Sequence, residues 1–148
     1  MPITIRPLLA RDRESWNPLW QAYLTFYKSE LTDEITEFTW QRLIADSEEI
    51  MGFVALDEAG NLIGFAHYFY HQTTWSMSEY CYLEDLYINP TTRGGGAGEI
   101  LVNAVKEKAK SAGKTQFYWT TQNENFRARG LYNKLAGSST TVKYEIDL

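Results

Sequence analysis

The spacing of apolar residues along the chain predicts helices alternating with strands. Apolar and aromatic residues recur three and four positions apart over 12–29, which is typical of one buried helical face. The same spacing predicts helices over 34–45, from the glycine-rich stretch near 95 to about 112, and over 124–135. Short runs of apolar or alternating residues predict strands at 3–6, 51–56, 62–70, 79–88, 116–121 and 140–146.

The order of these elements, β-α-α-β-β-β-α-β-α-β, predicts the fold class. The sequence DEAGN between 51–56 and 62–70 is typical of a hairpin turn. Hairpins therefore dominate the first half, whereas strand–helix–strand units make up the second. We expect one α/β domain over residues 1–148, with a mixed sheet flanked by helices.

Composition and charge exclude several classes of protein. The formal net charge is −5, so no basic field favours binding to nucleic acid. Cys81 is the sole cysteine, which rules out an internal disulfide framework or a zinc ribbon. We see no signal peptide and no apolar run near the ~20 residues that span a membrane. The expectation is a soluble cytoplasmic protein with no membrane partner.

A glycine-rich stretch, RGGGAG at 93–98, lies between a predicted strand and a predicted helix. The first turn of a helix carries unpaired N–H groups and a partial positive charge, which favour an anion. Glycine lets those amides approach a phosphate, although it weakens a helix start by ~0.5–1 kcal/mol relative to alanine. Arg93 can add a charge-assisted hydrogen bond. A plain connecting turn is the competing interpretation, and we favour a phosphate site.

The spacing within this stretch restricts the ligand. A dinucleotide fingerprint needs a glycine where Glu99 stands, and no P-loop Gly-Lys-Ser/Thr occurs. The pattern Arg-x-x-Gly-x-Gly resembles the acetyl-CoA pyrophosphate loop of the GNAT N-acetyltransferase family. That resemblance implies acetyl-CoA as co-substrate, without a metal. The residues it implies at the pyrophosphate are Arg93, Gly94, Gly95, Gly96, Ala97, Gly98 and Glu99.

Two further motifs carry the same resemblance. YLEDLYINP at 82–90 is similar to the fourth strand of the family. NENFRARGLYNKLAG at 123–137 is similar to its Asn-x-x-Ala-x-x-x-Tyr helix, with Asn125 as a cofactor-binding residue and Tyr132 seven positions later. The resemblance implies a mixed, mostly antiparallel sheet flanked by helices. Gly137 is followed by serine instead of the usual aromatic residue, so the entry to the last strand is expected to differ.

A narrower resemblance is to the subgroup that contains the yeast "histone and other protein acetyltransferases". It rests on the aromatic residues between Trp16 and Tyr27, on HQTTW at 71–75 and on YWTTQNEN at 118–125. Members of that subgroup act on protein lysines, polyamines or free amino acids. The implied acceptor is therefore a primary amine, on a protein or on a small molecule.

Two adjacent carboxylates, Glu84 and Asp85, are the candidate bases. A lysine-like amine has a pKa of about 10.4, so it must lose a proton before it attacks a thioester. Adjacent residues of a regular strand point to opposite faces, so only one of the two is expected to face the cleft. Comparison with polyamine-acting members favours Glu84, and Asp85 stays open. The alternative is that both carboxylates brace neighbouring backbone.

The resemblance implies that Tyr132 is the general acid, although a core tyrosine would fit the same helix. A backbone N–H near Leu86 would meet the developing oxyanion. Leu86, Tyr87 and Ile88 would pair by main chain with the pantetheine arm, as an added strand does.

The acceptor-side candidates are Tyr27, His71, Trp75 and Glu84. Aromatic residues of the first long helix and Trp75 can stack on a cationic acceptor, although most of that stripe is expected in the core. His67 and His71 are four apart, and nothing supplies the further ligands of a metal site, so we expect a structural or acceptor-side role.

The sequence therefore predicts an acetyl-CoA-dependent N-acetyltransferase that acts on a primary amine by direct attack. A non-catalytic CoA-binding or regulatory module is the alternative. A nucleotide-binding protein fails on the spacing of the glycines. A homodimer or a higher homo-oligomer is plausible because edge strands and aromatic residues favour pairing between copies.

Overall fold

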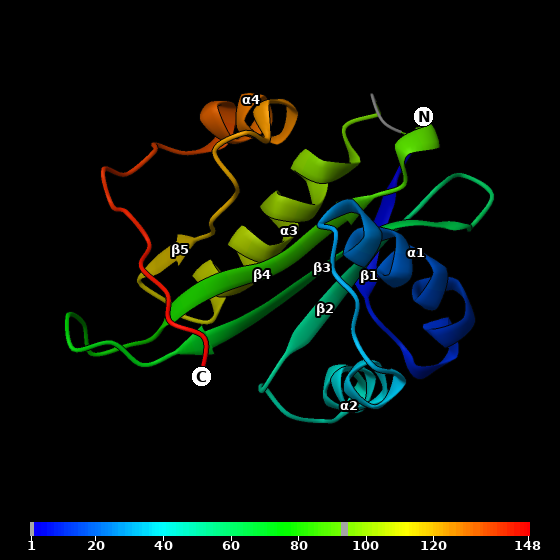
Figure 1. Ribbon diagram of the computed structural model, residues 1–148, viewed down its shortest axis with the longest axis horizontal. Coiled ribbons are helices and arrows are strands. Elements are labelled where there is room, and N and C mark those ends of the chain that lie inside the picture. The colour runs from blue at the N-terminus through cyan, green and yellow to red at the C-terminus, as the bar shows by residue number, and fades with distance from the viewer. Residues whose placement is uncertain (1, 93–94) are drawn as a thin grey trace.

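In the computed structural model, which describes residues 2–92 and 95–148, helices cover both faces of a central sheet (Figure 1). The sheet has five strands in the order β1-β2-β3-β4-β5. The first four are antiparallel neighbours, and β5 is parallel to β4. The strands are β1 (Thr4–Pro7), β2 (Met51–Leu56), β3 (Leu62–His71), β4 (Tyr80–Ile88) and β5 (Gln116–Tyr118).

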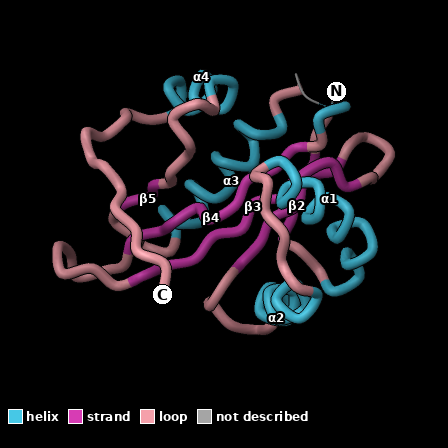
Figure 2. Tube along the Cα trace, in the orientation of Figure 1, coloured by secondary structure: helices cyan, strands magenta, loops and turns pink. Residues whose placement is uncertain are grey.

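The helices divide between the two faces of the sheet (Figure 2). Buried residues of α3 pack against β2, β3 and β4 on one face, whereas the aromatic residues of α1 and Trp40 of α2 pack on the other. The recurrence of apolar residues three and four positions apart therefore predicted the buried faces of these helices correctly. The helices are α1 (Arg13–Phe26), α2 (Asp33–Ile44), α3 (Ala97–Ser111) and α4 (Phe126–Leu135), with short 3₁₀ turns η1 (Ala10–Asp12) and η2 (Pro90–Thr92).

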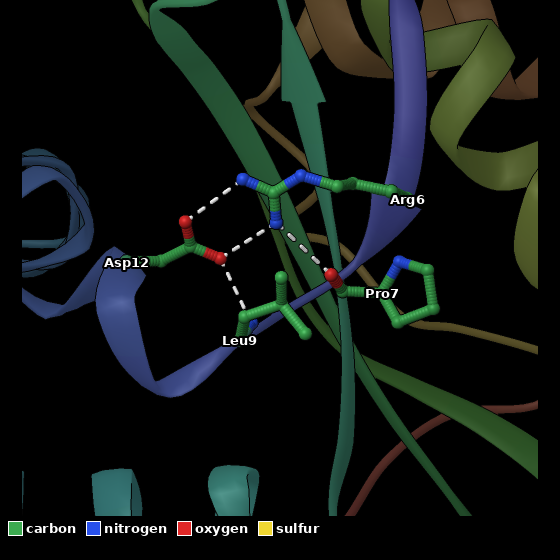
Figure 3. A network of polar contacts seen from close by, with 4 residues as sticks. All are labelled: Arg6, Pro7, Leu9 and Asp12. Carbon is green, nitrogen blue, oxygen red and sulfur yellow. Dashed lines mark hydrogen bonds and ion pairs between the residues drawn. The ribbon is translucent and has the colours of Figure 1, made fainter.

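A partly buried ion pair fixes the connection from β1 to α1 (Figure 3). The Arg6 guanidinium donates to both carboxylate oxygens of Asp12, at 2.8 and 2.9 Å. The backbone N–H of Leu9 also donates to Asp12 Oδ2, at 2.8 Å. The hydrogen bonds from Arg6 hold the pKa of Asp12 below its usual value. This bidentate pair sets where α1 begins relative to the sheet, and thereby the position of its aromatic face.

The middle of β4 contains a β-bulge. His67 of β3 pairs with Asp85, whereas the next residue of β3, Tyr68, pairs with Leu83, so Glu84 is the extra residue of β4. The strand is regular on either side of this point. A bulge changes the alternation of side chains, and here it lies beside the two acidic residues.

β5 is shorter than the sequence predicts. It pairs with β4 only through Tyr80, Cys81 and Tyr82, and it ends at Tyr118 instead of continuing to 121. Among the described residues, the backbone of 83–88 therefore has no strand partner on the side away from β3. β4 is thus an inner strand over Tyr80–Tyr82, which we call its closed half, and an edge strand over 83–88, its open half.

The predicted strand at 140–146 is wrong: residues 137–148 form neither helix nor strand in the structure. Its alternating apolar side chains are exposed, with Val142 at 69% and Ile146 at 86%. Alternation is a local property, but a strand also needs a neighbour to pair with and a surface to cover. Among the described helices, none is long and apolar enough to span a membrane.

Candidate active site

The glycine-rich turn leads into α3 in a backbone conformation that favours glycine. Gly96 is the N-cap of α3 and has φ +82°, in the left-handed region. Because glycine has no side chain to accept from the first turn, the amides there are left for another acceptor. Gly95 lies beside the Ile3 side chain, and an added Cβ would lie 3.6 Å from Ile3 Cδ1. Arg93 and Gly94, two of the predicted phosphate contacts, lie outside the described residues.

A cavity of about 430 Å³ opens at this helix start. It lies between the C-terminal end of α1, the open half of β4, the first turn of α3 and the face of α4. A Cβ on Gly98 would come within 3.2 Å of Leu131 Cδ2, so the Leu131 side chain would have to shift slightly to admit a larger residue there. The structure gathers ten of the predicted site residues here: Tyr27, Leu86, Tyr87, Ile88, Gly96, Ala97, Gly98, Glu99, Asn125 and Tyr132.

The residues that line this cavity fit acetyl-CoA. Free amides of a helix start are suited to a pyrophosphate. The open backbone edge of β4 beside them is suited to an extended, amide-containing chain. Arg127 and Lys134 of α4 also line the cavity and add positive charge; the sequence analysis missed both. Their spacing of seven on an amphipathic helix, like that of Asn125 and Tyr132, is the signal that would have found them.

Asn125 and Tyr132 are linked through α4. Asn125 is the N-cap, and its side-chain oxygen accepts from the Ala128 N–H at 3.4 Å. Two turns later Tyr132 makes an edge contact with the Trp119 ring, whose centroid lies 5.4 Å away. Burial, together with nearby Tyr27, raises the pKa of Tyr132 to about 12. The phenol is therefore neutral at physiological pH and keeps its proton available for donation.

The expectation that Glu84 and Asp85 point to opposite faces is wrong, and the bulge is the reason. Leu83 and Leu86 both pack into the core on the α3 side of the sheet. The two residues between them therefore share the other side, which α1 covers. Asp85 approaches His67 there, with Oδ2 2.9 Å from the ring Nδ1. Neither carboxylate lines the cavity itself, but Asp85 directly precedes Leu86 on its wall.

The two carboxylates differ in environment. Burial raises the pKa of Glu84, and the adjacent Asp85 raises it further. Glu84 is nevertheless the more exposed of the two, whereas the Asp85 side chain is 14% exposed. Burial also raises the pKa of Tyr23 on α1, with the Asp85 carboxylate as the next cause. The pair thus consists of an exposed carboxylate with a raised pKa, Glu84, and a partly buried one, Asp85, that lies against His67.

His67 was not a predicted catalytic residue, yet it is the partner of Asp85. Its ring is 1% exposed, and its Nε2 lies 3.1 Å from the Trp16 indole nitrogen. The structure therefore links α1, β3 and β4 through three polar side chains inside an aromatic core. A histidine within an apolar strand, followed at some distance by an acidic pair, was the available signal. This signal could not reveal the contact between His67 and Trp16, because the two residues are 51 positions apart in the sequence.

His71 and Trp75 lie apart from the cavity. His71 Nε2 is 2.8 Å from the Tyr118 hydroxyl, at the end of β3 where β5 closes the sheet. Trp75 lies in the following loop and is 88% exposed. Of the four acceptor-side candidates, Tyr27 lies on the cavity wall. Within the described residues, no group of three or more histidine, cysteine or acidic side chains could hold a metal ion.

Known proteins resemble this chain in sequence and in structure. The model of the "Acetyltransferase (GNAT) family" matches residues 13–137. The D-amino-acid N-acetyltransferase HPA3 of Saccharomyces cerevisiae is 36% identical over 144 residues, which cover 97% of this chain and 89% of that protein.

Solved structures with less sequence identity share the fold. A ribosomal-protein-alanine N-acetyltransferase from Brucella melitensis biovar Abortus 2308 superposes with a TM-score of 0.84 at 20% identity, over 99% of this chain and 100% of that one. AAC(6')-Iy, solved in complex with the bisubstrate analog CoA-S-monomethyl-acetylneamine, gives 0.83 at 19% identity, with 100% of both chains covered. These likenesses confirm the predicted fold class.

Proposed function

The chain belongs to the acetyltransferase (GNAT) family and is an acyltransferase, and we propose that it moves an acetyl group from acetyl-CoA to a primary amine by direct attack. The observation that carries this proposal is the cavity in which the start of α3, the open half of β4 and Tyr132 meet. Each of these has a part in acyl transfer to nitrogen: binding of the phosphates, alignment of the thioester and supply of a proton.

The binding of acetyl-CoA is assigned to backbone groups. Ala97, Gly98 and Glu99 of the first turn line the cavity, and the N-cap Gly96 supplies no side-chain cap, so their amides suit the pyrophosphate. The free edge of Leu86, Tyr87 and Ile88 suits the pantetheine amides. Bound there, acetyl-CoA supplies an activated acetyl thioester. A backbone N–H near Leu86 is our candidate for stabilising negative charge on the acetyl oxygen.

Glu84 is the base that we favour. A base must be largely deprotonated at the working pH yet bind a proton well. The raised pKa of Glu84 strengthens its binding of a proton. Its exposure also lets an acceptor or a bridging water approach. Asp85 is the alternative base, although His67 already occupies one of its oxygens. Either carboxylate would take a proton from the attacking amine.

Tyr132 is the proposed acid. Its hydroxyl lies in a half-buried position on the cavity wall, and its pKa of about 12 keeps it protonated until a stronger base arrives. The hydroxyl would give its proton to the sulfur that leaves as CoA. A phenol transfers a proton to sulfur only when the two are close, so placement on the wall is the essential part of the argument.

A free amino acid is the acceptor class that we favour. The yeast relative that covers 97% of this chain is named as an acetyltransferase of D-amino acids. Polyamines and protein lysines are the other candidates, and the net charge of −5 is compatible with cationic acceptors.

Release of free CoA thiol tests the proposal. Purified protein would be incubated with acetyl-CoA and a panel of D- and L-amino acids, polyamines and lysine peptides. We expect thiol release that depends on the amine, with acetylated product found by mass spectrometry. Tight binding of acetyl-CoA without release by any amine would instead support a non-catalytic CoA-binding module.

A further inference from the structure

Three side chains form a continuous polar chain from the aromatic core to the acidic pair of β4. The Trp16 indole nitrogen lies 3.1 Å from His67 Nε2, and His67 Nδ1 lies 2.9 Å from Asp85 Oδ2. Trp16 is fully buried, His67 is 1% exposed and the Asp85 side chain is 14% exposed. They belong to α1, β3 and β4, so three elements are joined at this point.

The chemistry of these groups determines where the protons lie. An indole N–H can only donate, so His67 Nε2 must accept and carries no proton. The remaining ring proton is then on Nδ1, which donates to the Asp85 carboxylate. A doubly protonated ring would place an N–H against the indole N–H inside an apolar core, at the cost of the Trp16 hydrogen bond. His67 is therefore neutral in this arrangement, and Asp85 is the acceptor.

We propose that His67, fixed in its Nδ1–H tautomer by Trp16, is a positioning residue that holds Asp85 as an oriented anion beside Glu84. This inference rests on the proposed function, since its purpose is to prepare the carboxylate pair for the amine. The bulge in β4 makes it possible, because it places Glu84 and Asp85 on the same side of the sheet.

The groups around Asp85 fit this role. Tyr23 of α1, Tyr27 at the C-cap of that helix and His67 of β3 lie near it, and Glu84 adjoins it on β4. Burial and the Asp85 charge raise the pKa of Tyr23, so that phenol stays neutral and can donate. Hydrogen-bond donors on two sides fix the orientation of the Asp85 carboxylate. A fixed negative charge there in turn makes Glu84 the better proton acceptor of the pair.

Two amide substitutions of His67 separate positioning from packing. His67→Asn keeps an N–H donor near the position of Nδ1, whereas His67→Gln keeps a polar atom near Nε2, facing Trp16. Measured well below both melting temperatures, turnover of His67→Asn should stay within about threefold of the wild type. That of His67→Gln should fall about 10²-fold, the typical cost of a displaced catalytic group. KM for acetyl-CoA should be unchanged in both.

Equal losses of turnover that follow equal losses of melting temperature would overturn the proposal, because His67 would then only pack. The pH dependence adds a second readout. Asp85→Asn should move the acid limb of the rate profile to lower pH, since it removes the charge that raises the pKa of Glu84. A profile identical to the wild type would exclude Asp85 as the fixed charge.

Nitrogen NMR of the histidine rings tests the tautomer without any activity. At pH 8, we expect His67 to carry its proton on Nδ1 in the wild type and to lose this preference in Trp16→Phe. A proton on Nε2 in the wild type would overturn the proposal. Failure of every amine in the thiol assay would refute the proposed function alone, because the NMR result stands independently.

Discussion

The two halves of β4 have the same neighbour on one side and differ on the other. Over Tyr80–Tyr82 the strand lies between β3 and β5, with both of its edges paired. Over 83–88 its one strand partner among the described residues is β3, and its other edge borders the cavity at Leu86, Tyr87 and Ile88. The bulge at Glu84 lies in the open half, close to where β5 ends.

Under the proposed function, this difference lets one strand serve both stability and chemistry. The closed half contributes Cys81, which is fully buried in the core beneath α3. The open half leaves backbone groups unpaired, which an isolated protein normally avoids. Such an edge is tolerable where a ligand with its own amides completes it. Substitutions in the two halves should therefore affect different properties.

Removal of the Tyr132 hydroxyl should have the largest effect. Tyr132→Phe keeps the edge contact with Trp119 but loses the proton donor, so turnover should fall by about 10²- to 10⁴-fold. The affinity for acetyl-CoA, measured by calorimetry, should change less than about twofold, which is under 0.5 kcal/mol. Tyr82→Phe in the closed half is the matched control. It removes a phenol whose oxygen lies 3.2 Å from Thr120 Oγ1, and turnover should not change. Equal loss of turnover and affinity in Tyr132→Phe would remove its role as acid.

Loss of the favoured base should have the next largest effect. Glu84→Gln should lower kcat/KM about 10²-fold at neutral pH. In the wild type the base works only when deprotonated, so kcat/KM falls as the pH drops through its pKa. Because that pKa is raised, the fall should occur above the pH expected for an ordinary glutamate of pKa about 4.3.

Glu79→Gln is the control for this experiment. Glu79 lies just before β4, where Lys114 donates to it at 2.9 Å, at the closed end of the sheet. Glu79→Gln should leave the pH dependence of kcat/KM unchanged. If Glu84→Gln kept the pH profile of kcat/KM seen in the wild type, Asp85 would be the base instead.

Substitution of the helix N-cap should weaken binding of acetyl-CoA at least 10-fold. Gly96 has φ +82°, and a β-branched residue in that region costs about 1–3 kcal/mol. Gly96→Val would therefore shift the backbone whose amides face the cavity. Gly113 follows the other end of the same helix with φ +78°, and an added Cβ there would meet no heavy atom within 4 Å, so Gly113→Val carries the same strain away from the cavity. Both variants should lose thermal stability, but only the first should lose affinity. Unchanged affinity in Gly96→Val would contradict our account of the glycine-rich turn.

A truncation in β5, the strand that pairs with the closed half of β4, should have the smallest effect on function. Phe117 of β5 is half-buried against the core beneath α3, so Phe117→Ala should cost about 1–2 kcal/mol of unfolding free energy, less than the ~3–5 kcal/mol of a fully buried phenylalanine. Chemical denaturation measures this loss. The affinity for acetyl-CoA should stay within about twofold. A parallel fall in affinity would show that the two halves of β4 are energetically coupled.

Much of the site could be found from the sequence, because its parts lie on short, regular segments. The glycine-rich turn marked the start of α3, and the Asn–Tyr spacing marked one face of α4. The positions of Glu84 and Asp85 relative to the sheet could not be found, since a bulge depends on how two strands pair. Alternation within β4 alone predicted opposite sides, and the register with β3 reversed that prediction.

The sequence by itself determined the identity and the order of the elements up to α4, since periodicity and turn residues act within a few positions. It also determined that a glycine-rich turn precedes α3 and that an acidic pair lies on β4. The tertiary structure alone decided that β5 is short, that residues 140–146 form no strand, and that Trp16, His67 and Asp85 meet. These features depend on contacts between segments that are far apart in the chain, and their geometry is set by the packing of the whole sheet against its helices.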